Sequence, residues 1–561
     1  MKFRRIFSIF LIILIALLLL QSESWNDKMG QVEPFRGAKL EKSVFAPLIS
    51  KNLNKLSVVK LQVDNKTYDS ENGEILLNSN LEVLASFTLI RNIFYANARL
   101  YNDSDIVIQR NNDDFKFKIG SVKGLKNNKE VNITVPPEKV GNKVYMSLKD
   151  ICKIFSYKYD WNDTKKVVSL KSEGSEKPVL RAFYDLRKEG RASKIKNQGK
   201  LSTCWAFAAT SAIESLLLPS EKVSFSALDM ANRNTYKRKA DSPGDYMMAV
   251  SYLLSWIGPI ANGGGEPVKH LQEVHFYNNS EMDDIKWAIF KNGGVSTSLY
   301  AETGGDIFEK SDYYNRDTDA YYYYGKKKSN HDIVIIGWDD NYPASKFSHK
   351  CPGNGAFICQ NSWGDNFGDN GVFYVSYYDT NIGNYSVSYV KLESNKNYDN
   401  IYQSDLCGDI GSVGYGMDTA MAANVYRMRT DEVVKAVGFY NLNRNTDYEV
   451  YIVSNFKNVK SFAEKTLVAS GTLKEKGYFT IPINPTVDTK EGEDVAVIVS
   501  FKSKKKKNQI AIEYDGNSLT HNVDISDGEG YISPDGNDWE RIENKFDANV
   551  CLKVYTDEKK K

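Results

Sequence analysis

Apolar and polar positions alternate with different periods along the chain. From about Leu56 to Leu170 short strand-like runs alternate with short helical ones, and Val144 to Leu170 reads as strand, helix, strand, turn and strand. From roughly Asn400 to Tyr555 short alternating runs are separated by turns rich in Asn, Asp, Gly and Lys. Helical and strand-like runs are mixed in between. The pattern therefore predicts a small α+β domain, a central α+β domain and a C-terminal all-β sandwich or jelly roll.

One helix of the central domain is strongly marked. Apolar residues recur at helical spacing from Ala208 to Leu218, and Cys204 falls in the first turn of this helix. Ser202 or Thr203 is the expected cap. A helix N-terminus favours negative charge and so lowers the pKa of a thiol toward the reactive thiolate. Cys204 is therefore a candidate nucleophile.

Changes in pattern and composition set the expected boundaries of the parts of the chain. The polar stretch before Phe183 separates the first domain from the central one. The predicted parts are a signal peptide or signal anchor (1–24), an arm (25–54), a stalk-like domain (55–172), a linker (173–182), a central domain (183–395), a β-sandwich (396–556) and a charged tail (557–561).

The N-terminus predicts export. Lys2, Arg4 and Arg5 precede an apolar run from Ile6 to Leu20, which is short for a membrane span and suits a secretory signal. Small residues around Ser24 offer a cleavage site. The alternative is an uncleaved signal anchor, which is the one route by which we expect contact with a membrane. Both readings place the protein outside the cytoplasm, secreted or at the cell surface.

Composition narrows the range of partners. With 42% hydrophobic and 26% charged residues the chain is of ordinary globular type, and its net charge of +2 gives no reason to expect nucleic acid as a partner. Six cysteines are few for an exported protein of 561 residues. Cys351 with Cys359, and Cys407 with Cys551, remain open as disulfide pairs. Only five histidines and no C-x-x-C argue against a zinc site, and we expect no metal or cofactor.

Two downstream motifs strengthen the case for Cys204 as a nucleophile. His331 begins a continuous apolar run of strand length, which suits a base held in a fixed place. Asn361 carries a neutral amide that can accept a hydrogen bond from an imidazole and fix its tautomer. Gln198, shortly before Cys204, offers an N–H to a developing oxyanion, together with the backbone N–H of Cys204.

These motifs resemble those of the papain family of cysteine peptidases over about Phe183 to Tyr389. The resemblance implies a helical subdomain joined to a β-barrel-like subdomain, and it implies a role for each motif residue. Carried over by position, these are Gln198 as oxyanion donor, Cys204 as nucleophile, His331 as base, Asn361 as the residue that orients it, and Trp363 as a shield over the Asn361–His331 hydrogen bond.

The chain also departs from that family. Leu201 stands where plant and lysosomal members have a cysteine, so their neighbouring disulfide is absent. Asp332 follows the histidine where a small residue is usual; on a strand it should point to the opposite face, with its charge still able to modulate His331. The helical inhibitory propeptide of the plant enzymes is not apparent upstream.

The flanking domains carry resemblances of their own. Val144 to Leu170 resembles the stalk domain first described in copper amine oxidases, and Leu81 to Ile108 looks like a looser copy of the same unit. No copper or oxidase chemistry is implied. Gly411–Gly416 and Val433–Tyr440 resemble the lectin-like domain of bacterial papain homologues, among them surface-layer-processing cysteine peptidases. Binding of a cell-surface glycan and simple buttressing of the peptidase both remain open for this domain.

The sequence therefore predicts an exported, papain-like cysteine endopeptidase that hydrolyses peptide bonds through a thioester. Its expected substrates are proteins or peptides, including surface proteins or the chain itself. One alternative is a surface adhesin or carbohydrate-binding protein with a relic peptidase domain. A second keeps the Cys204, His331 and Asn361 set and passes the thioester to an amine instead of water.

Overall fold

The structure is a computed structural model. It describes residues 60–559 apart from short gaps at 64–65, 69–73, 79, 142, 174–177, 303–307, 309, 505–508, 517–519, 521–522 and 527–528. The predicted signal segment (1–24) and arm (25–54) lie outside the described residues. None of the described helices has the length and apolar character needed to cross a membrane.

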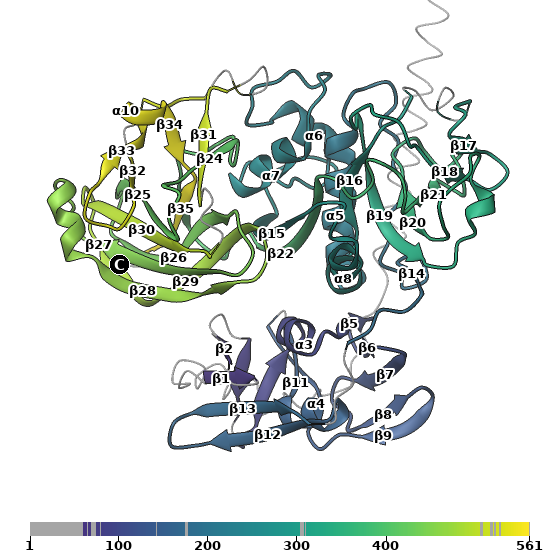
Figure 1. The fold of residues 1–561 in the computed structure, drawn as a ribbon. Helices are drawn as coiled ribbons and strands as arrows, with labels where there is room; N and C mark the ends of the chain where they lie inside the picture. The colour runs from purple at the N-terminus through teal and green to yellow at the C-terminus, as the bar shows by residue number, and fades with distance from the viewer. Residues whose placement is uncertain are drawn as a thin grey trace, which may run out of the picture. The chain divides into compact units, whose positions relative to one another are not determined.

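The N-terminal domain is built from three small sheets and two short helices (Figure 1, purple and blue). The sheets have the strand orders β12-β13-β1-β2, β10-β11-β4-β3 and β5-β6-β7-β8-β9. The elements are β1 (Lys60–Val63), β2 (Lys66–Tyr68), β3 (Ile75–Leu77), β4 (Val83–Ser86), α3 (Phe87–Phe94), β5 (Asn97–Tyr101), β6 (Asp105–Arg110), β7 (Asp113–Lys118), β8 (Lys123–Lys126), β9 (Lys129–Asn132), β10 (Glu138–Val140), β11 (Lys143–Ser147), α4 (Leu148–Ile154), β12 (Tyr157–Asn162) and β13 (Val167–Ser172).

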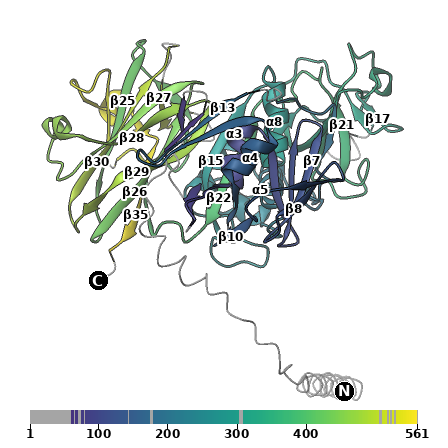
Figure 2. The ribbon, with the colours of Figure 1, turned by 90° about the horizontal axis from the view of Figure 1, so that it is seen from below.

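The same local unit occurs twice in this domain. β4 leads directly into α3, and β11 leads directly into α4. Each helix is capped by the last serine of its strand, since Ser86 accepts a hydrogen bond from the backbone N–H of Leu89 and Ser147 accepts one from Asp150. The two strands pair antiparallel and both helices pack on them; Figure 2 shows the domain from below. The strand–helix–strand–strand order expected for Leu81–Ile108 and Val144–Leu170 is present in both segments.

The central domain sets helices against a long mixed sheet. The helices α5, α6 and α7 lie on one side of β19, which α5 contacts directly. The elements are β14 (Phe183–Asp185), α5 (Cys204–Leu217), α6 (Ala227–Asn232), α7 (Tyr246–Leu254), β15 (Lys269–Tyr277), α8 (Met282–Asn292), β16 (Val295–Leu299), β17 (Tyr314–Asn315), β18 (Ala320–Tyr321), β19 (His331–Asp339), η2 (Ala344–Lys346), β20 (Ala356–Gln360), β21 (Val372–Ser376) and β22 (Ser386–Ser394).

The C-terminal domain is the predicted β-sandwich. Its core lies between β26, β29 and β35 on one side and a six-stranded sheet of order β28-β27-β30-β25-β32-β33 on the other, with β24-β31-β34 at one end. The elements are β23 (Asn400–Tyr402), β24 (Gly411–Val413), β25 (Thr419–Arg427), β26 (Glu432–Asn441), β27 (Thr446–Val453), η3 (Val459–Glu464), β28 (Thr466–Leu473), β29 (Gly477–Thr489), β30 (Asp494–Lys502), β31 (Ile510–Tyr514), β32 (Gly530–Ser533), β33 (Glu540–Arg541), α10 (Ile542–Phe546), β34 (Ala548–Val550) and β35 (Leu552–Glu558).

One sheet runs through both the central and the C-terminal domains. β15 pairs with β22 along one edge and with β29 along the other, in the register Glu273↔Phe479, Val274↔Tyr478 and His275↔Gly477. The described residues thus form a 13-stranded sheet from β17 to β23, and Figure 1 shows its middle strands side by side. Beside this seam, Arg444 of the C-terminal domain forms ion pairs with Glu281 and Asp284 of the central domain. The sequence pattern predicted two domains in succession and gave no sign of a shared sheet.

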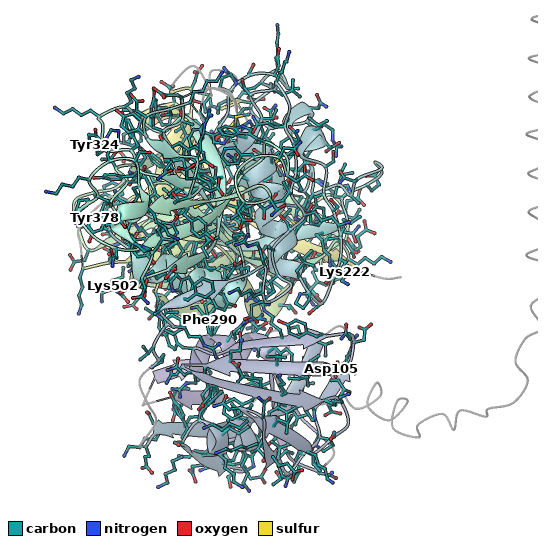
Figure 3. The ribbon with its side chains drawn as sticks, turned by 90° about the vertical axis from the view of Figure 1, so that its right-hand side faces the viewer. Asp105, Lys222, Phe290, Tyr324, Tyr378 and Lys502 are labelled. Atoms are coloured by element: carbon teal, nitrogen blue, oxygen red, sulfur yellow. The ribbon has the colours of Figure 1, made fainter. Side chains whose placement is uncertain are left out.

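The N-terminal domain contacts the central domain through polar side chains. Asn97 donates a hydrogen bond to the hydroxyl of Tyr184 at 3.3 Å, and Tyr101 donates one to the backbone carbonyl of Glu189 at 3.2 Å. Arg191 is fully buried at this junction, where it donates to the carbonyl of Phe290 at 3.0 Å. Figure 3 labels Phe290 near this boundary and Asp105 within the N-terminal domain. Two arginine side chains, Arg99 and Arg191, are buried at this junction. Burial and the nearby charge of Arg191 lower the pKa of Arg99 well below its usual range.

The structure answers the question of disulfide pairing that the sequence left open. All six are free thiols, so neither Cys351 with Cys359 nor Cys407 with Cys551 forms a bridge. Cys407 and Cys551 are buried where the C-terminal domain meets α7, and Cys551 donates to the carbonyl of Gly408 at 3.3 Å. Burial raises the pKa of Cys407 to about 12, which keeps this thiol protonated.

The start of the central domain depends on a close backbone approach at Gly337. β14 pairs antiparallel with β19, with Asp185 opposite Gly337. A Cβ atom at Gly337 would lie 2.2 Å from the carbonyl oxygen of Tyr184. Tyr184 is buried and packs on Trp338, with ring centroids 5.1 Å apart. A side chain at Gly337 therefore forces the two strands apart.

We predict that Gly337→Ala lowers the free energy of unfolding of the central domain by about 2–3 kcal/mol, since the added methyl group meets backbone that cannot turn aside. Denaturant unfolding followed by tryptophan fluorescence measures this change. Glu266→Ala, at an exposed position, is the control. An unchanged midpoint for Gly337→Ala would show that the strands tolerate the methyl group.

Candidate active site

The nucleophile candidate lies at the predicted helix end. α5 begins at Cys204, and Thr203 is its N-cap residue, but the Thr203 hydroxyl makes no capping hydrogen bond. That hydroxyl is buried without a partner. The helix start is instead held by the packing of its many buried residues against β19, β16 and β22. Thr203 thus holds the predicted N-cap position without a side-chain capping bond, and Cys204 lies in the first turn as predicted.

Burial and local donors act in opposite directions on the Cys204 thiol. Burial raises the pKa of Cys204 to about 12, and the nearby Asp332 carboxyl adds to this shift. Backbone N–H groups of Asp332 and Trp205 point toward the sulfur and lower the pKa. The contact with the Asp332 N–H also places the sulfur at the start of β19, next to His331. An isolated Cys204 thiolate is therefore costly here. Loss of the thiol proton becomes favourable only when a nearby group takes up the proton or when the sulfur reacts at the same time.

His331 is fixed in one tautomer by Asn361. The Nε2 atom of His331 lies 2.9 Å from Oδ1 of Asn361, and both residues are buried. The same Oδ1 accepts the backbone N–H of Ser362 at 2.8 Å, which identifies it as the oxygen of the amide. Nε2 of the neutral ring is therefore the protonated nitrogen, and Nδ1 remains free to accept a proton. Burial lowers the pKa of His331 to about 4, against the Asn361 hydrogen bond, which raises it.

Trp363 covers the imidazole. Its ring stacks on that of His331 with centroids 4.5 Å apart and an interplanar angle of 21°. Trp363 is itself held edge-on by Phe308 and Phe367, at 5.2 and 5.1 Å. This aromatic cluster excludes water from one face of the ring, as expected for a residue that shields the His331–Asn361 hydrogen bond.

Gln198 lies in a loop that pairs with the Asn361 loop. The Gln198 backbone N–H donates to the Ser362 carbonyl at 2.8 Å, and the Ser362 hydroxyl donates to Oε1 of Gln198 at 2.6 Å. Asn197 and Trp363 form an isolated antiparallel bridge. One N–H of the Gln198 amide donates to the Leu201 carbonyl at 2.7 Å, which leaves the other for a ligand. The pairing thus joins the segment before Cys204 to the segment that orients His331.

A half-buried lysine and a buried glutamate outside the sequence motifs anchor the Gln198 loop to α5. The Lys196 ammonium donates to Glu214 at 2.7 Å and to the hydroxyl of Thr210 at 2.9 Å. Glu214 also accepts the backbone N–H of Phe225 at 2.7 Å. A glutamate within an otherwise apolar helix was the available signal, because a buried acid requires a partner.

The position of Asp332 revises a second expectation. Its side chain accepts a hydrogen bond from Ser298 and lines a small pocket that it shares with Trp205. The Asp332 carboxyl raises the pKa of Cys204. The pKa of His331 is lowered by burial and raised by the Asn361 hydrogen bond. Asp332 therefore affects the thiol rather than the imidazole. Among the described residues, no three His, Cys, Asp or Glu side chains are grouped as a metal site requires.

The structure brings the imidazole of His331 and the amide of Asn361 together, and it places Cys204 at the start of α5. Three family models match parts of the chain. Residues 180–390 match the family model of the papain family cysteine protease, residues 62–170 that of the copper amine oxidase N-terminal domain, and residues 401–556 that of the lectin-like domain. The chain thus carries a papain-like cysteine peptidase domain between a stalk-type domain and a lectin-like domain, as the sequence predicted.

Individual relatives show the same pattern. Mouse cathepsin S is 27% identical over 226 residues, which are 37% of this chain and 61% of that protein, and a cysteine protease of Blomia tropicalis is 23% identical over 260 residues, 40% of this chain and 71% of that protein. The chain therefore spans less than two thirds of the length of the cathepsin.

Two solved structures of the clostridial cysteine protease Cwp84 share the fold. One, obtained after propeptide cleavage, has a TM-score of 0.60 at 24% identity and covers 67% of this chain and 99% of that one. The other, of the cysteine protease and lectin-like domains of Cwp84, a surface layer associated protein of Clostridium difficile, has a TM-score of 0.59 at 24% identity and covers 69% and 91%. The likeness confirms the multidomain fold class, with a papain-like domain followed by an all-β one.

We predict that Lys196→Met lowers the free energy of unfolding by about 3 kcal/mol, because it leaves the Glu214 carboxylate buried without its counter-charge. The Lys196 and Glu214 side chains are only 13% and 4% exposed. Lys194→Met, at an exposed position of the same loop, is the matched control. Denaturant titration of both variants provides the measurement, and equal midpoints would rule out the ion pair as the anchor of the loop.

Proposed function

We propose that this protein is an exported cysteine peptidase in which Cys204 is the nucleophile, His331 the general base and acid, and Asn361 the residue that orients the imidazole. The observation that carries the proposal is the 2.9 Å contact between His331 Nε2 and Asn361 Oδ1. This contact leaves Nδ1 as the basic nitrogen beside the end of a helix that begins with a thiol. Substrates are peptide bonds of proteins, including surface proteins or the chain itself.

Formation of the thioester begins with loss of the thiol proton. The Cys204 sulfur attacks the peptide carbonyl carbon as its proton passes to Nδ1 of His331, which avoids the cost of a buried thiolate without a counter-ion. The resulting imidazolium keeps its Nε2–H bond to Asn361. It then gives its proton to the leaving amine as the C–N bond breaks. A water that loses a proton to Nδ1 hydrolyses the thioester and releases Cys204.

The oxyanion is stabilised by two donors in this proposal. The backbone N–H of Cys204 lies at the start of α5, where the peptide dipoles favour negative charge. The free N–H of the Gln198 amide is the second donor, and its orientation is fixed by the bonds to Ser362 and Leu201. Such preorganised donors stabilise a developing charge without reorganisation during the reaction.

The flanking domains support a location at the cell surface. The N-terminal apolar run favours export, and a protein of similar fold is described as surface layer associated.

The pairing of β15 with β29 favours a C-terminal domain that braces the peptidase domain. The lectin-like match leaves a cell-surface glycan as a further partner of this domain. Membrane contact arises only through an uncleaved signal anchor.

We predict that Cys204→Ala lowers peptide hydrolysis by at least about 10⁴-fold and abolishes labelling by an epoxysuccinyl inhibitor, because it removes the nucleophile of the proposed reaction. Mass spectrometry of the labelled protein and a fluorogenic peptide assay measure the two effects. Cys351→Ala, which alters a buried thiol elsewhere in the same domain, is the control. Retained hydrolysis by Cys204→Ala would refute the assignment of the nucleophile.

We also predict that the acid limb of kcat/KM lies near pH 4 rather than near the ordinary histidine value of about 6.5. His331 accepts the thiol proton only when neutral, and burial keeps it neutral down to its lowered pKa of about 4. The profile of kcat/KM against pH tests this, with circular dichroism at each pH to show that the protein remains folded. An acid limb close to pH 6.5 would mean that the imidazole is solvated during the reaction.

A further inference from the structure

A buried arginine at the junction of the N-terminal and central domains has two unused donor atoms. Arg191 is 0% exposed. Its Nη1 atom donates to the hydroxyl of Tyr184 and to the carbonyl of Phe290, each at 3.0 Å. Its Nε and Nη2 atoms are buried and have no hydrogen-bond partner among the described residues. In the part of the chain that the structure describes, the guanidinium of Arg191 thus bonds to neutral oxygens alone.

The two unused nitrogens lie on the same edge of the guanidinium. Nε and Nη2 direct their N–H bonds side by side, and this fork is the arrangement that binds an anion through two hydrogen bonds. A buried donor without a partner costs about 1–3 kcal/mol, and a buried charge without a counter-charge costs more. A fork that is closed to solvent and free of protein partners therefore points to a bound anion.

A second arginine, from the N-terminal domain, belongs to the same network. Nε of Arg99 donates to Oδ1 of Asn97 at 3.1 Å, and the amide of Asn97 donates to the Tyr184 hydroxyl at 3.3 Å. Arg191 donates to that hydroxyl as well. Arg99 is itself buried. A short chain of hydrogen bonds thus links two buried guanidiniums that come from two domains.

Both arginines also bind the C-terminal end of α8, near the position of Phe290 in Figure 3. Arg99 donates to the carbonyl of Lys291, and Arg191 donates to that of Phe290. The unpaired carbonyls at the end of a helix carry about half of a negative charge in total. The helix end therefore offsets only part of the charge of the two guanidiniums.

The arginines at this junction repel one another. Burial and the charges of Arg191 and Arg91 lower the pKa of Arg99 well below its usual range. Burial and the charge of Arg191 also lower the pKa of Arg91, to about 10. A like charge nearby disfavours the charged form of a group, so both shifts indicate a positive potential around Arg191.

Two carboxylates close to these arginines have other partners. Glu189 accepts hydrogen bonds from Nε2 of Gln109 at 3.3 and 3.4 Å, and Glu74 pairs with Lys143 at 2.8 Å. Neither carboxylate accepts a hydrogen bond from Arg191. An anion on the free edge of Arg191 supplies the missing negative charge in a region of low dielectric.

The position of the fork limits the size of its ligand. Nε and Nη2 of Arg191 are closed to solvent, so the ligand must be enclosed between the two domains. An organic anion would have to bury its carbon chain there as well. A chloride ion is small and has no preferred direction for hydrogen bonds, so it can accept both N–H groups at once.

We propose that the Nε–Nη2 edge of Arg191 binds a small inorganic anion of the chloride class at the junction of the N-terminal and central domains. The anion accepts both N–H groups and offsets the repulsion between Arg191 and Arg99. It thereby strengthens the attachment of the N-terminal domain to the central one. This site is separate from the reaction proposed for Cys204.

The test measures the Tm of the full chain in sodium chloride and in sodium gluconate at equal ionic strength, since gluconate is too large for an enclosed site. We expect the Tm to be about 2–5 °C higher in chloride, as for a ligand present at about ten times its Kd. Arg191→Met keeps an apolar stem without the fork and should abolish the difference; methionine is often tolerated in place of a buried charge. Lys222→Met, at an exposed position, should retain it.

Crystals grown in sodium bromide locate the anion directly. An anomalous peak beside Nε and Nη2 of Arg191 would support the proposal, whereas an ordered water there without anomalous signal would overturn it. The same Tm in both salts, or a difference that persists in Arg191→Met, would also overturn it. If Arg191→Met does not fold, the bromide experiment decides alone. Neither measurement uses peptide hydrolysis, so the result does not depend on the proposed peptidase function.

Discussion

The candidate active site depends on the pairing of two loops that come from distant parts of the chain. The loop before Cys204 and the loop after Asn361 exchange backbone hydrogen bonds from Gln198 to Ser362 and from Gly364 to Lys196. Each bond contributes only about 1 kcal/mol, but together they set the distance between the helix that carries the thiol and the sheet that carries the base. The Lys196–Glu214 ion pair ties this arrangement to α5.

The sheet extends this constraint beyond the peptidase domain. β19, which begins with His331, belongs to the same sheet as β26 and β35 of the lectin-like domain, because β15 pairs with β29. A strand in a continuous sheet cannot shift without breaking ladder hydrogen bonds on both sides. The lectin-like domain therefore supports the frame in which His331 is placed. The polar junction with the N-terminal domain adds a different kind of contact, through side chains rather than strand pairing.

Burial gives the site its electrostatic character. It disfavours both an isolated thiolate at Cys204 and an isolated imidazolium at His331, so proton transfer between them and attack on a substrate are naturally coupled. The same burial leaves Asp332 as a carboxyl without a cationic partner, beside the nucleophile. The chemistry proposed for Cys204 and His331 thus depends on one property, the burial of both groups in this part of the domain.

The sequence by itself determined the order and class of the three domains and the helix that starts at Cys204, and it supplied the candidate residues of the site, since these follow from local periodicity and from motifs of fixed residue type. It did not determine the shared sheet through β15 and β29, the free state of the cysteines or the Lys196–Glu214 pair. Nor did it place Asp332 beside the thiol in a pocket with unpaired hydroxyls. Those features depend on which distant segments pack together, and periodicity reports whether a residue is buried, not what it is buried against.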